Sequence, residues 1–483
     1  MVIFLISLLL LIAGYILYGA VVEKIFGADS SRKTPAYHLR DDVDFVPMPS
    51  WKVFLIQFLN IAGLGPIFGA IMGVMFGPSA FLWIVFGTIF GGAVHDYLSG
   101  MISLRKNGGS LPEIVGEELG GGVKQTMRAF SMLLMILVGA VFVVNPADLL
   151  AGMTPDTLNR IFWICVIFAY YMLATLLPVD KLIGKIYPLF GAALLFMAVG
   201  LLGYMLFTGI DIPIDMNQGL YNRAENAADN PIFPMMFVSI ACGAISGFHA
   251  TQSPMMARCL KNEKMGRPIF YGAMVAEGIV ALIWAAAAIT FTGGYTQLEA
   301  YMDAHSQLPA TLVNDISVSW LGKVGGILAI LGVVAAPITT GDTALRSARL
   351  IAADFLGFSQ KTILKRLIIS VPVFILTFIV MTVDFTILWR YFGWCNQTLS
   401  VFTLWAITVF LSRKKGYSFI LTLLPAMFMT CVCVSYLLYA PSLGIALDYS
   451  ISVGAGLILS FVFLILFFRK RNKLLMGLRK EAV

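Results

Sequence analysis

The chain has 483 residues, of which 59% are apolar and 12% are charged, and its formal net charge is +7. Soluble domains of average composition carry about 25% charged and about 45–50% apolar residues. The composition therefore excludes an ordinary soluble enzyme, a disordered regulator and a secreted disulfide scaffold, and it indicates a polytopic membrane protein. No run of Lys and Arg interleaved with aromatic residues suggests nucleic acid as a partner. The six cysteines lack zinc-ligand spacing, so we interpret them as small core residues and expect no metal site.

Apolar runs separated by polar interruptions predict thirteen membrane-spanning helices. Their approximate bounds are 2–22, 51–77, 79–104, 124–150, 159–178, 183–208, 232–254, 268–292, 320–340, 366–384, 386–411, 416–439 and 447–468. We interpret the first run as a retained helix, because it lacks the positive n-region and cleavage site of a signal peptide. Three longer connections, at 23–50, 209–231 and 293–319, do not resemble folded soluble domains.

The distribution of Lys and Arg over the connections predicts the orientation. Connections after odd-numbered spans carry 29 of these residues and connections after even-numbered spans carry 4, which accounts for all 33. Cytoplasmic loops of membrane proteins carry the excess of positive charge. We therefore expect the N-terminus outside the cell and the C-terminus in the cytoplasm.

The second predicted span contains residues that favour a break in the helix. Pro66 lacks a backbone N–H and leaves a carbonyl one turn earlier without its donor, while Gly63 and Gly65 lower the cost of unwinding. Glycines every four residues would also let another helix approach closely; they are Gly65, Gly69, Gly73 and Gly77. Two interpretations stay open, a kinked and tightly packed helix or a broken helix whose ends face a substrate.

The seventh span breaks in a similar way, since it is unusually polar between Ser246 and Ser253 and Pro254 follows directly. Cys242, Ser246, His249 and Ser253 follow the spacing i, i+4, i+7 and i+11, so we expect them to share one helical face. His249 could be a hydrogen-bonded core residue, but the neighbouring Gly247 and Gln252 favour a binding site.

The two broken spans are five spans apart. That spacing resembles the LeuT-type arrangement, in which two inverted five-helix repeats each open with a discontinuous helix. We expect an all-α polytopic membrane protein of about 13 transmembrane helices, with a LeuT-like 5+5 core, one extra N-terminal helix and two extra C-terminal helices. It would be one transmembrane domain over 1–483, divided into 1–50, 51–208 (repeat one), 209–411 (repeat two) and 412–483.

Two further spans carry polar residues at membrane depth. His95 and Asp96 form a pair in the third span, which is a functional hypothesis by default; the alternative is a structural pair in the headgroup region. Thr339, Thr340 and Asp342 surround Gly341 at the end of the ninth span. Hydroxyl oxygens suit a hard cation such as sodium, although helix capping would also explain them.

Four motifs in order resemble the carbon starvation A (CstA) family of transporters, in a shorter form without the long insertions and C-terminal extension of larger relatives. They lie at 63–118, 247–254, 337–343 and 389–397. The resemblance implies an inner-membrane, starvation-linked secondary transporter of peptides, and of pyruvate with protons in some members.

We therefore expect a symporter of the bacterial inner membrane, not an enzyme, that imports a small carboxylate-bearing nutrient (pyruvate or short peptides) with protons by alternating access. Its partners would be the lipid bilayer and a small-molecule substrate, with no nucleic acid and no cofactor beyond the coupling ion. A sodium-coupled peptide or amino-acid symporter is the alternative, and a channel is a further one.

The expected site residues fall into two groups. The substrate-binding candidates are Gly63, Gly65, Ser246, His249, Gln252 and Ser253. The ion-coupling candidates are His95, Asp96, Thr339, Thr340 and Asp342. Proton coupling would use a titratable His or Asp, whereas sodium coupling would use carbonyls near Gly63 with the two threonine hydroxyls.

Overall fold

A computed structural model describes residues 1–42, 44–176, 179–214, 219–224, 226–305, 308–358, 362–383, 385–413, 416–440 and 445–481. Every regular element in these ranges is a helix, and the ranges contain no strand. Within the described residues, nine helices are long and apolar enough to span a membrane, or eleven if each of two bent pairs counts as one span. The all-helical membrane fold is therefore confirmed, while the count of thirteen stays a prediction.

The first half of the fold runs from the N-terminus to the long connection at 209–231. Its helices are α1 (Val2–Ala13), η1 (Gly14–Tyr18), α2 (Gly19–Phe26), α3 (Pro35–His38), α4 (Ser50–Ile61), η2 (Gly65–Gly69), α5 (Ala70–Val74), α6 (Ser79–Phe86), η3 (Gly87–Gly92), α7 (Ala93–Arg105), α8 (Leu111–Leu119), α9 (Gly121–Met153), α10 (Arg160–Leu176) and α11 (Val179–Phe207). The segments η1, η2 and η3 are π-helical turns within longer helical runs.

The second half begins with the other broken helix. Its helices are η4 (Ile232–Met236), α12 (Phe237–Ser239), α13 (Gly247–Ala257), η5 (Glu263–Met265), η6 (Arg267–Tyr271), α14 (Gly272–Thr292), α15 (Tyr295–Ala304), α16 (Pro309–Ala329), η7 (Ile330–Ala335), α17 (Ala336–Leu356), α18 (Ile363–Val380), α19 (Phe385–Ser412), α20 (Ile420–Tyr439) and α21 (Tyr449–Glu481).

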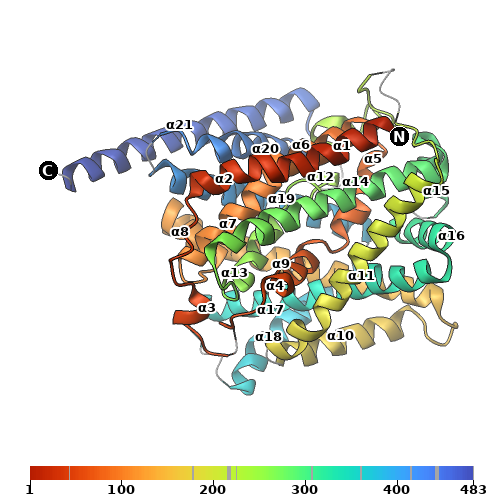
Figure 1. Ribbon diagram of the computed structural model, residues 1–483, viewed down its shortest axis with the longest axis horizontal. Coiled ribbons are helices and arrows are strands. Elements are labelled where there is room, and N and C mark those ends of the chain that lie inside the picture. The colour runs from red at the N-terminus through yellow and green to blue at the C-terminus, as the bar shows by residue number, and fades with distance from the viewer. Residues whose placement is uncertain are drawn as a thin grey trace.

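The two ends of the helical bundle carry different connections. Figure 1 shows the N-terminus and α15 at one end, and α3, α8 and the C-terminal end of α21 at the other. The connections that contain α3 and α8 therefore lie at the opposite end from the connection that contains α15. The orientation of the protein in the membrane stays a prediction.

Three sequence predictions about helix ends need correction. Residues 293–319 are not an irregular connection, because α15 and the first part of α16 occupy most of them. The helix does not begin near residue 320, as predicted for the ninth span, because α16 already starts at Pro309. Residue 320 instead lies close to a kink at Gly322, which has φ 61° and ψ −147°. The ninth span does not end at residue 340 either, since α17 continues to Leu356. Thr339, Thr340 and Asp342 therefore lie inside a helix rather than at the end of one.

The centre of the bundle is formed by α13 and α14, which are buried over most of their length. Helix α13 contacts α7, α19 and α4, and α14 contacts α4, η2 and α5. Helices α1, α18 and α21 lie at the margin and expose apolar side chains, among them Leu9, Ile375 and Ile458. An exposed apolar surface of this extent is expected where lipid, rather than water, surrounds the protein.

Candidate functional site

The two broken helices contact each other at their breaks. A Cβ atom placed on Gly65 would lie 2.2 Å from Cys242 Cβ, and one on Gly73 would lie 2.0 Å from Ile240 Cγ1. A Cβ on Gly69 would lie 2.8 Å from the carbonyl oxygen of Ser239. Real Cβ contacts are not this short, so only glycine fits at these positions. The glycine stripe of the first broken helix therefore packs against the second broken helix.

The first break lies where the sequence predicts it. Helix α4 ends at Ile61, the chain resumes as η2 at Gly65, and the two segments meet at a bend of 55°. The carbonyl of Leu59, just before the break, accepts a hydrogen bond from Thr340 Oγ1 at 3.2 Å. A Cβ on Gly63 would lie 3.5 Å from the same hydroxyl oxygen. The break thus faces α17, which supplies that hydroxyl.

The second break spans residues 240–246 and leaves several carbonyls outside helical hydrogen bonding. Side chains of neighbouring helices donate to them. Trp83 Nε1 lies 3.3 Å from the carbonyl oxygen of Ile240, and Thr88 Oγ1 lies 3.0 Å from that of Gly243. Non-helical backbone at membrane depth is tolerated only where protein or water satisfies it. Because α13 begins at Gly247, Cys242 and Ser246 precede the helix, and the expected single helical face is wrong.

Asn396 of α19 caps the start of α13 from a neighbouring helix. Its Oδ1 accepts hydrogen bonds from the backbone N–H of Phe248 at 2.7 Å and from Ser246 Oγ at 3.0 Å, and its Nδ2 lies 3.3 Å from Cys242 Sγ. A Cβ on Gly247 would lie 2.3 Å from the backbone nitrogen of Ser400. This close approach brings the capping amide within reach. Asn396 thus fixes both the break and the helix that carries His249.

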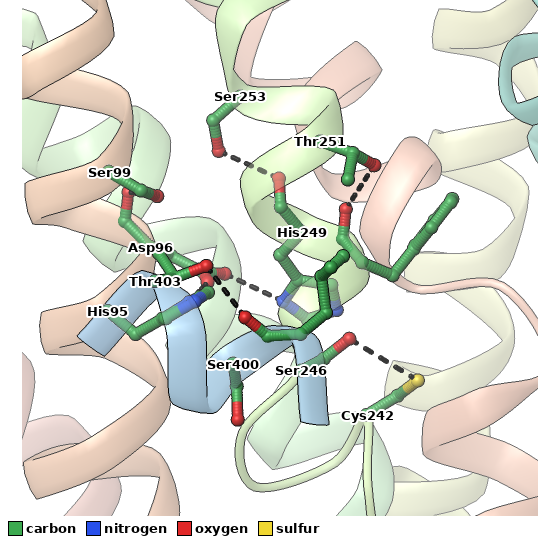
Figure 2. Close-up of polar contacts among 12 residues, drawn as sticks. His95, Asp96, Ser99, Cys242, Ser246, His249, Thr251, Ser253, Ser400 and Thr403 are labelled. Carbon is green, nitrogen blue, oxygen red and sulfur yellow. Dashed lines mark hydrogen bonds and ion pairs between the residues drawn. The ribbon is translucent and has the colours of Figure 1, made fainter. Parts of the chain in front are cut away.

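Four titratable side chains form a continuous buried chain beside this break. His95 Nδ1 lies 2.8 Å from Asp96 Oδ1, and His249 Nδ1 lies 2.7 Å from Asp96 Oδ2. His249 Nε2 lies 3.4 Å from Glu277 Oε2 on α14. All four side chains are fully buried. Figure 2 shows Asp96 and His249 facing each other from α7 and α13, with Cys242 and Ser246 in the loop that precedes α13.

The Glu277 end of this row of buried side chains has room for one more proton. An ionised Asp96 accepts hydrogen bonds from both imidazoles, so the Nδ1–H of His249 is committed to it. In the described part of the chain, neither His249 Nε2 nor either oxygen of Glu277 has a hydrogen-bond partner. A buried carboxylate without donors is costly. One proton between His249 Nε2 and Glu277 Oε2 would remove that cost, held on either group.

The same corner offers ligands for a metal ion. Cys242 Sγ, His249 Nε2 and a Glu277 oxygen lie within 4.8 Å of one another. Thiolate, imidazole and carboxylate are the donors that zinc prefers, and Asp96 would orient the imidazole from behind. The spacing of the cysteines predicted no metal site, because it does not include Glu277, which joins Cys242 and His249 from another helix.

The remaining ion-coupling candidates form a separate group near the first break. Thr339 Oγ1 donates to the carbonyl of Ala336 in its own helix at 2.7 Å. Tyr187 Oη donates to Asp342 Oδ2 at 2.7 Å, while Asp342 Oδ1 has no partner among the described residues. The predicted ion-coupling residues therefore divide between two places, with His95 and Asp96 at the second break and the α17 residues at the first.

A cavity of about 340 Å³ leads from the contact between the breaks to the end of the bundle that holds α15. Its lining includes Gly65 and Cys242 at the breaks, together with Arg390, Glu299 and Asp303. Among the predicted substrate residues, Gly65 lines this cavity, whereas the others lie outside its lining: Gly63, Ser246, His249, Gln252 and Ser253. Ser253 Oγ donates to the carbonyl of His249 at 3.0 Å, and Gln252 Nε2 donates to Thr251 Oγ1 at 2.9 Å.

Sequence reasoning missed Glu277 and Arg390 as site residues. A signal for Glu277 was available, because it is a lone carboxylate in an otherwise apolar span and such residues are functional hypotheses by default. The same signal was available for Arg390, which is a lone charged residue in the predicted eleventh span. What the sequence could not reveal is that each lies beside a break.

Comparison with known proteins places the chain in a family. Residues 1–157 and 148–324 match the family described as carbon starvation protein CstA. The chain belongs to the CstA family. The resemblance inferred from the four motifs is confirmed.

Relatives of the chain include named transporters. A membrane protein of Haemophilus influenzae is 44% identical over 344 residues, which cover 61% of this chain and 92% of the relative. A Bacillus subtilis protein named peptide transporter CstA is 27% identical over 533 residues, covering 89% of this chain and 88% of its own. The Escherichia coli pyruvate/proton symporter BtsT is 28% identical over 334 residues, covering 56% of this chain and 46% of its own.

A solved structure supports the architecture. A mutant of the Eremococcus coleocola manganese transporter aligns over 90% of this chain and 99% of its own, with a TM-score of 0.52 and 12% sequence identity. At this identity the likeness concerns the fold alone. Together with the two broken helices, it confirms the LeuT-like fold class of this CstA family member.

Proposed function

We propose that this CstA family protein is a secondary active symporter that imports a small carboxylate-bearing nutrient, pyruvate or a short peptide, together with protons. Transport would proceed by alternating access around the two broken helices. The relatives' names support transport rather than catalysis. The sequence contains no nucleotide-binding motif, which favours an ion gradient over ATP as the driving force.

The observation that carries the proposal is the buried chain of Asp96, His249 and Glu277. It joins three helices, α7, α13 and α14, and it lies directly behind the contact between the two breaks. The proton that His249 and Glu277 would share lies at a fully buried position, which water can reach only after a conformational change. Gain or loss of that proton would change how tightly α14 is held to α13, which couples protonation to the movement of the broken helix.

The cavity supports a carboxylate-bearing substrate. Arg390 lines the cavity with a guanidinium, a group that binds carboxylates in a bidentate geometry, and Glu299 and Asp303 line it with carboxylates that suit an ammonium group. Met72, Phe76 and Met235 add apolar side chains to the lining. A short peptide, with one charge of each sign and an apolar body, would use all three features, while pyruvate would use the guanidinium alone.

The protein is a multi-pass membrane protein, and we propose the bacterial inner membrane as its location, with the N-terminus outside and the C-terminus in the cytoplasm. In that orientation the cavity opens to the outside of the cell. The bundle end that bears α3 and α8 is then the cytoplasmic end, where Glu263 accepts hydrogen bonds from Arg105 Nη2 at 3.1 Å and from the backbone N–H of Asp29 at 2.8 Å.

Sodium coupling is the second candidate, because one specific contact favours it. The hydroxyl of Thr340 and the carbonyl of Leu59 present oxygens at the first break, 3.2 Å apart. Thr340→Val would remove one of these oxygens at nearly constant volume. If sodium couples transport, this variant should need a higher sodium concentration for half-maximal uptake. If protons couple transport, its effect should be small.

The experiment that tests the proposal is uptake by the purified protein in liposomes. Labelled pyruvate and a labelled dipeptide would be offered separately, with either a proton gradient or a sodium gradient imposed. We expect accumulation of at least one substrate under the proton gradient alone. Accumulation under the sodium gradient alone would favour sodium coupling. If the substrate only moved down its own concentration gradient and neither ion gradient drove accumulation, the protein would be a channel.

A further inference from the structure

A second cavity, separate from the transport site, lies between α19, α20 and α21. It has a volume of about 450 Å³, and we call it the α21 crevice. Its lining includes Trp394, Trp405, Thr430, Phe463, Phe467 and Lys470. Helix α21 lies at the margin of the bundle, and most of its length is exposed apolar surface. In a membrane, this crevice therefore borders the lipid acyl chains.

The crevice has the length of one membrane leaflet. On α21 its lining runs from Leu459 to Lys470, and eleven residues of α-helix rise about 16 Å. A bilayer's hydrocarbon core is about 30 Å thick, so one leaflet is about half of that. Lys470 lies 21 residues after the start of α21 at Tyr449, a rise of about 32 Å that places it at the far membrane boundary. The crevice thus extends from that boundary to the middle of the membrane.

The walls of the crevice present apolar ring faces. Trp405 Nε1 donates to Thr430 Oγ1 at 3.0 Å, and Trp394 Nε1 donates to the carbonyl of Cys433 at 3.0 Å. Both indole N–H groups are therefore satisfied by neighbouring helices, which leaves the rings free to contact an apolar occupant. Because a lipid chain in the membrane is already surrounded by hydrocarbon, the wall would hold it by close van der Waals packing rather than by a hydrophobic driving force.

The cations at the boundary end of the crevice differ in whether another side chain already binds them. Arg413 Nη2 is paired with Glu118 at 2.7 Å, and the guanidinium of Arg471 lies over the Phe419 ring at 4.7 Å from its centroid. Glu118 also accepts from Lys106 at 3.1 Å. Lys470 lines the crevice and makes no ion pair with another described residue. The ammonium of Lys470 is therefore the cation that a headgroup at this level would meet.

We propose that the α21 crevice binds one anionic phospholipid of the leaflet on this side, with an acyl chain between α19, α20 and α21 and its phosphate at Lys470. The apolar length selects a lipid chain, and the charge selects an anionic headgroup. Trp394 in the crevice wall is two residues from Asn396, which caps the broken helix. A bound chain would therefore stabilise the part of α19 that holds this cap in place.

Native mass spectrometry of the full chain tests the headgroup. The protein in detergent would be offered equal amounts of palmitoyl-oleoyl phosphatidylglycerol and palmitoyl-oleoyl phosphatidylcholine. We expect phosphatidylglycerol to be retained in preference. Lys470→Gln should reduce that preference about fivefold, because one Lys near an anionic lipid contributes about 1 kcal/mol. Arg469→Gln is the matched control, since Arg469 is exposed on the same turn and does not line the crevice. Equal retention of both lipids by the wild type, or equal losses in the two variants, would overturn the assignment.

A second measurement, which does not depend on the Lys470 variant, tests whether an acyl chain occupies the crevice. Phosphatidylglycerol with brominated acyl chains quenches tryptophan fluorescence at contact, and Trp394 and Trp405 line the crevice. We expect stronger quenching by brominated phosphatidylglycerol than by brominated phosphatidylcholine. Val434→Phe narrows the crevice and should remove that difference. Trp405→Phe removes one of the two tryptophans in the crevice and should reduce the difference. An identical response to the two brominated lipids in the wild-type protein would show that the crevice holds no anionic lipid.

Discussion

Asp96 Oδ2 on α7 lies 2.7 Å from His249 Nδ1 on α13, although the two residues are 153 positions apart in the sequence. The contact links the helix that packs behind the second break to the helix that begins at it. It also leaves the other nitrogen of His249 facing Glu277 at 3.4 Å. The two residues therefore connect a position for a proton with the element that would move during transport.

Asp96 and His95 should differ in importance although they are adjacent. Asp96 contacts both imidazoles, whereas His95 contacts Asp96 alone. Asp96→Asn should reduce proton-driven accumulation at least about tenfold, because a hydrogen bond to a charged group contributes about 1.5–3 kcal/mol. His95→Gln keeps a donor beside Asp96 and should have a smaller effect. Uptake under a pH gradient measures both variants, and a larger loss in His95→Gln would contradict the assignment.

Gly65 and Cys242 should behave as a coupled pair. Gly65→Ala places a methyl group 2.2 Å from Cys242 Cβ, which should destabilise the protein by about 1–3 kcal/mol through overpacking and slow transport. Adding Cys242→Gly removes the clashing atoms and should recover part of the stability. The melting temperature of the two single variants and the double variant measures the coupling. Losses that simply add would mean that the two breaks are not in contact.

Gly247 should be irreplaceable for packing reasons. A Cβ there would lie 2.3 Å from the backbone nitrogen of Ser400, and the backbone of α19 cannot yield as a side chain can. Gly247→Ala should therefore lower the melting temperature. The matched control is Gly203→Ala in α11, where the nearest atom lies 3.9 Å away; a methyl group there should be neutral or stabilising by about 0.5–1 kcal/mol. Equal effects of both substitutions would contradict the close approach of α13 and α19.

The orientation predicts the result of reporter fusions. A reporter inserted at Gly219, in the connection before the second broken helix, should be active outside the cell. A reporter fused after α21 should be active in the cytoplasm, because 29 of the 33 Lys and Arg residues belong to connections on that side. Enzyme and fluorescent reporters with opposite compartment requirements measure both positions. Two reporters on the same side would contradict the seven spans that are expected between the two positions.

Local features of the fold were predictable from the sequence because their causes are local. Pro66 between glycines predicts the break after α4, and the structure has it there. The spacing of Ser110 and Glu113 is a local signal for a helix start, and the two residues form a reciprocal capping box at the start of α8. The second break was also expected from the polar residues after Ser246, although its non-helical stretch begins earlier, at Ile240.

The composition of the candidate site was less predictable because it depends on long-range packing. His249 and Asp96 were each candidates, but their pairing depends on how α13 lies against α7. Glu277 joins them from a third helix, and no local pattern reveals its partner. The helical nature of 293–319 was missed because polar residues such as Gln297 and Asp303 resemble a loop in composition, while α15 packs its apolar side, including Leu298, on the bundle.

The most direct test of proton coupling through Asp96, His249 and Glu277 compares substrate exchange with gradient-driven accumulation in the same liposomes, for the wild type and Glu277→Gln. Glu117→Gln serves as the control, since Glu117 is an exposed carboxylate in α8. The proposed mechanism predicts that Glu277→Gln exchanges external for internal substrate at close to the wild-type rate, and that an imposed pH gradient no longer drives accumulation. Accumulation by Glu277→Gln at the wild-type level would contradict it.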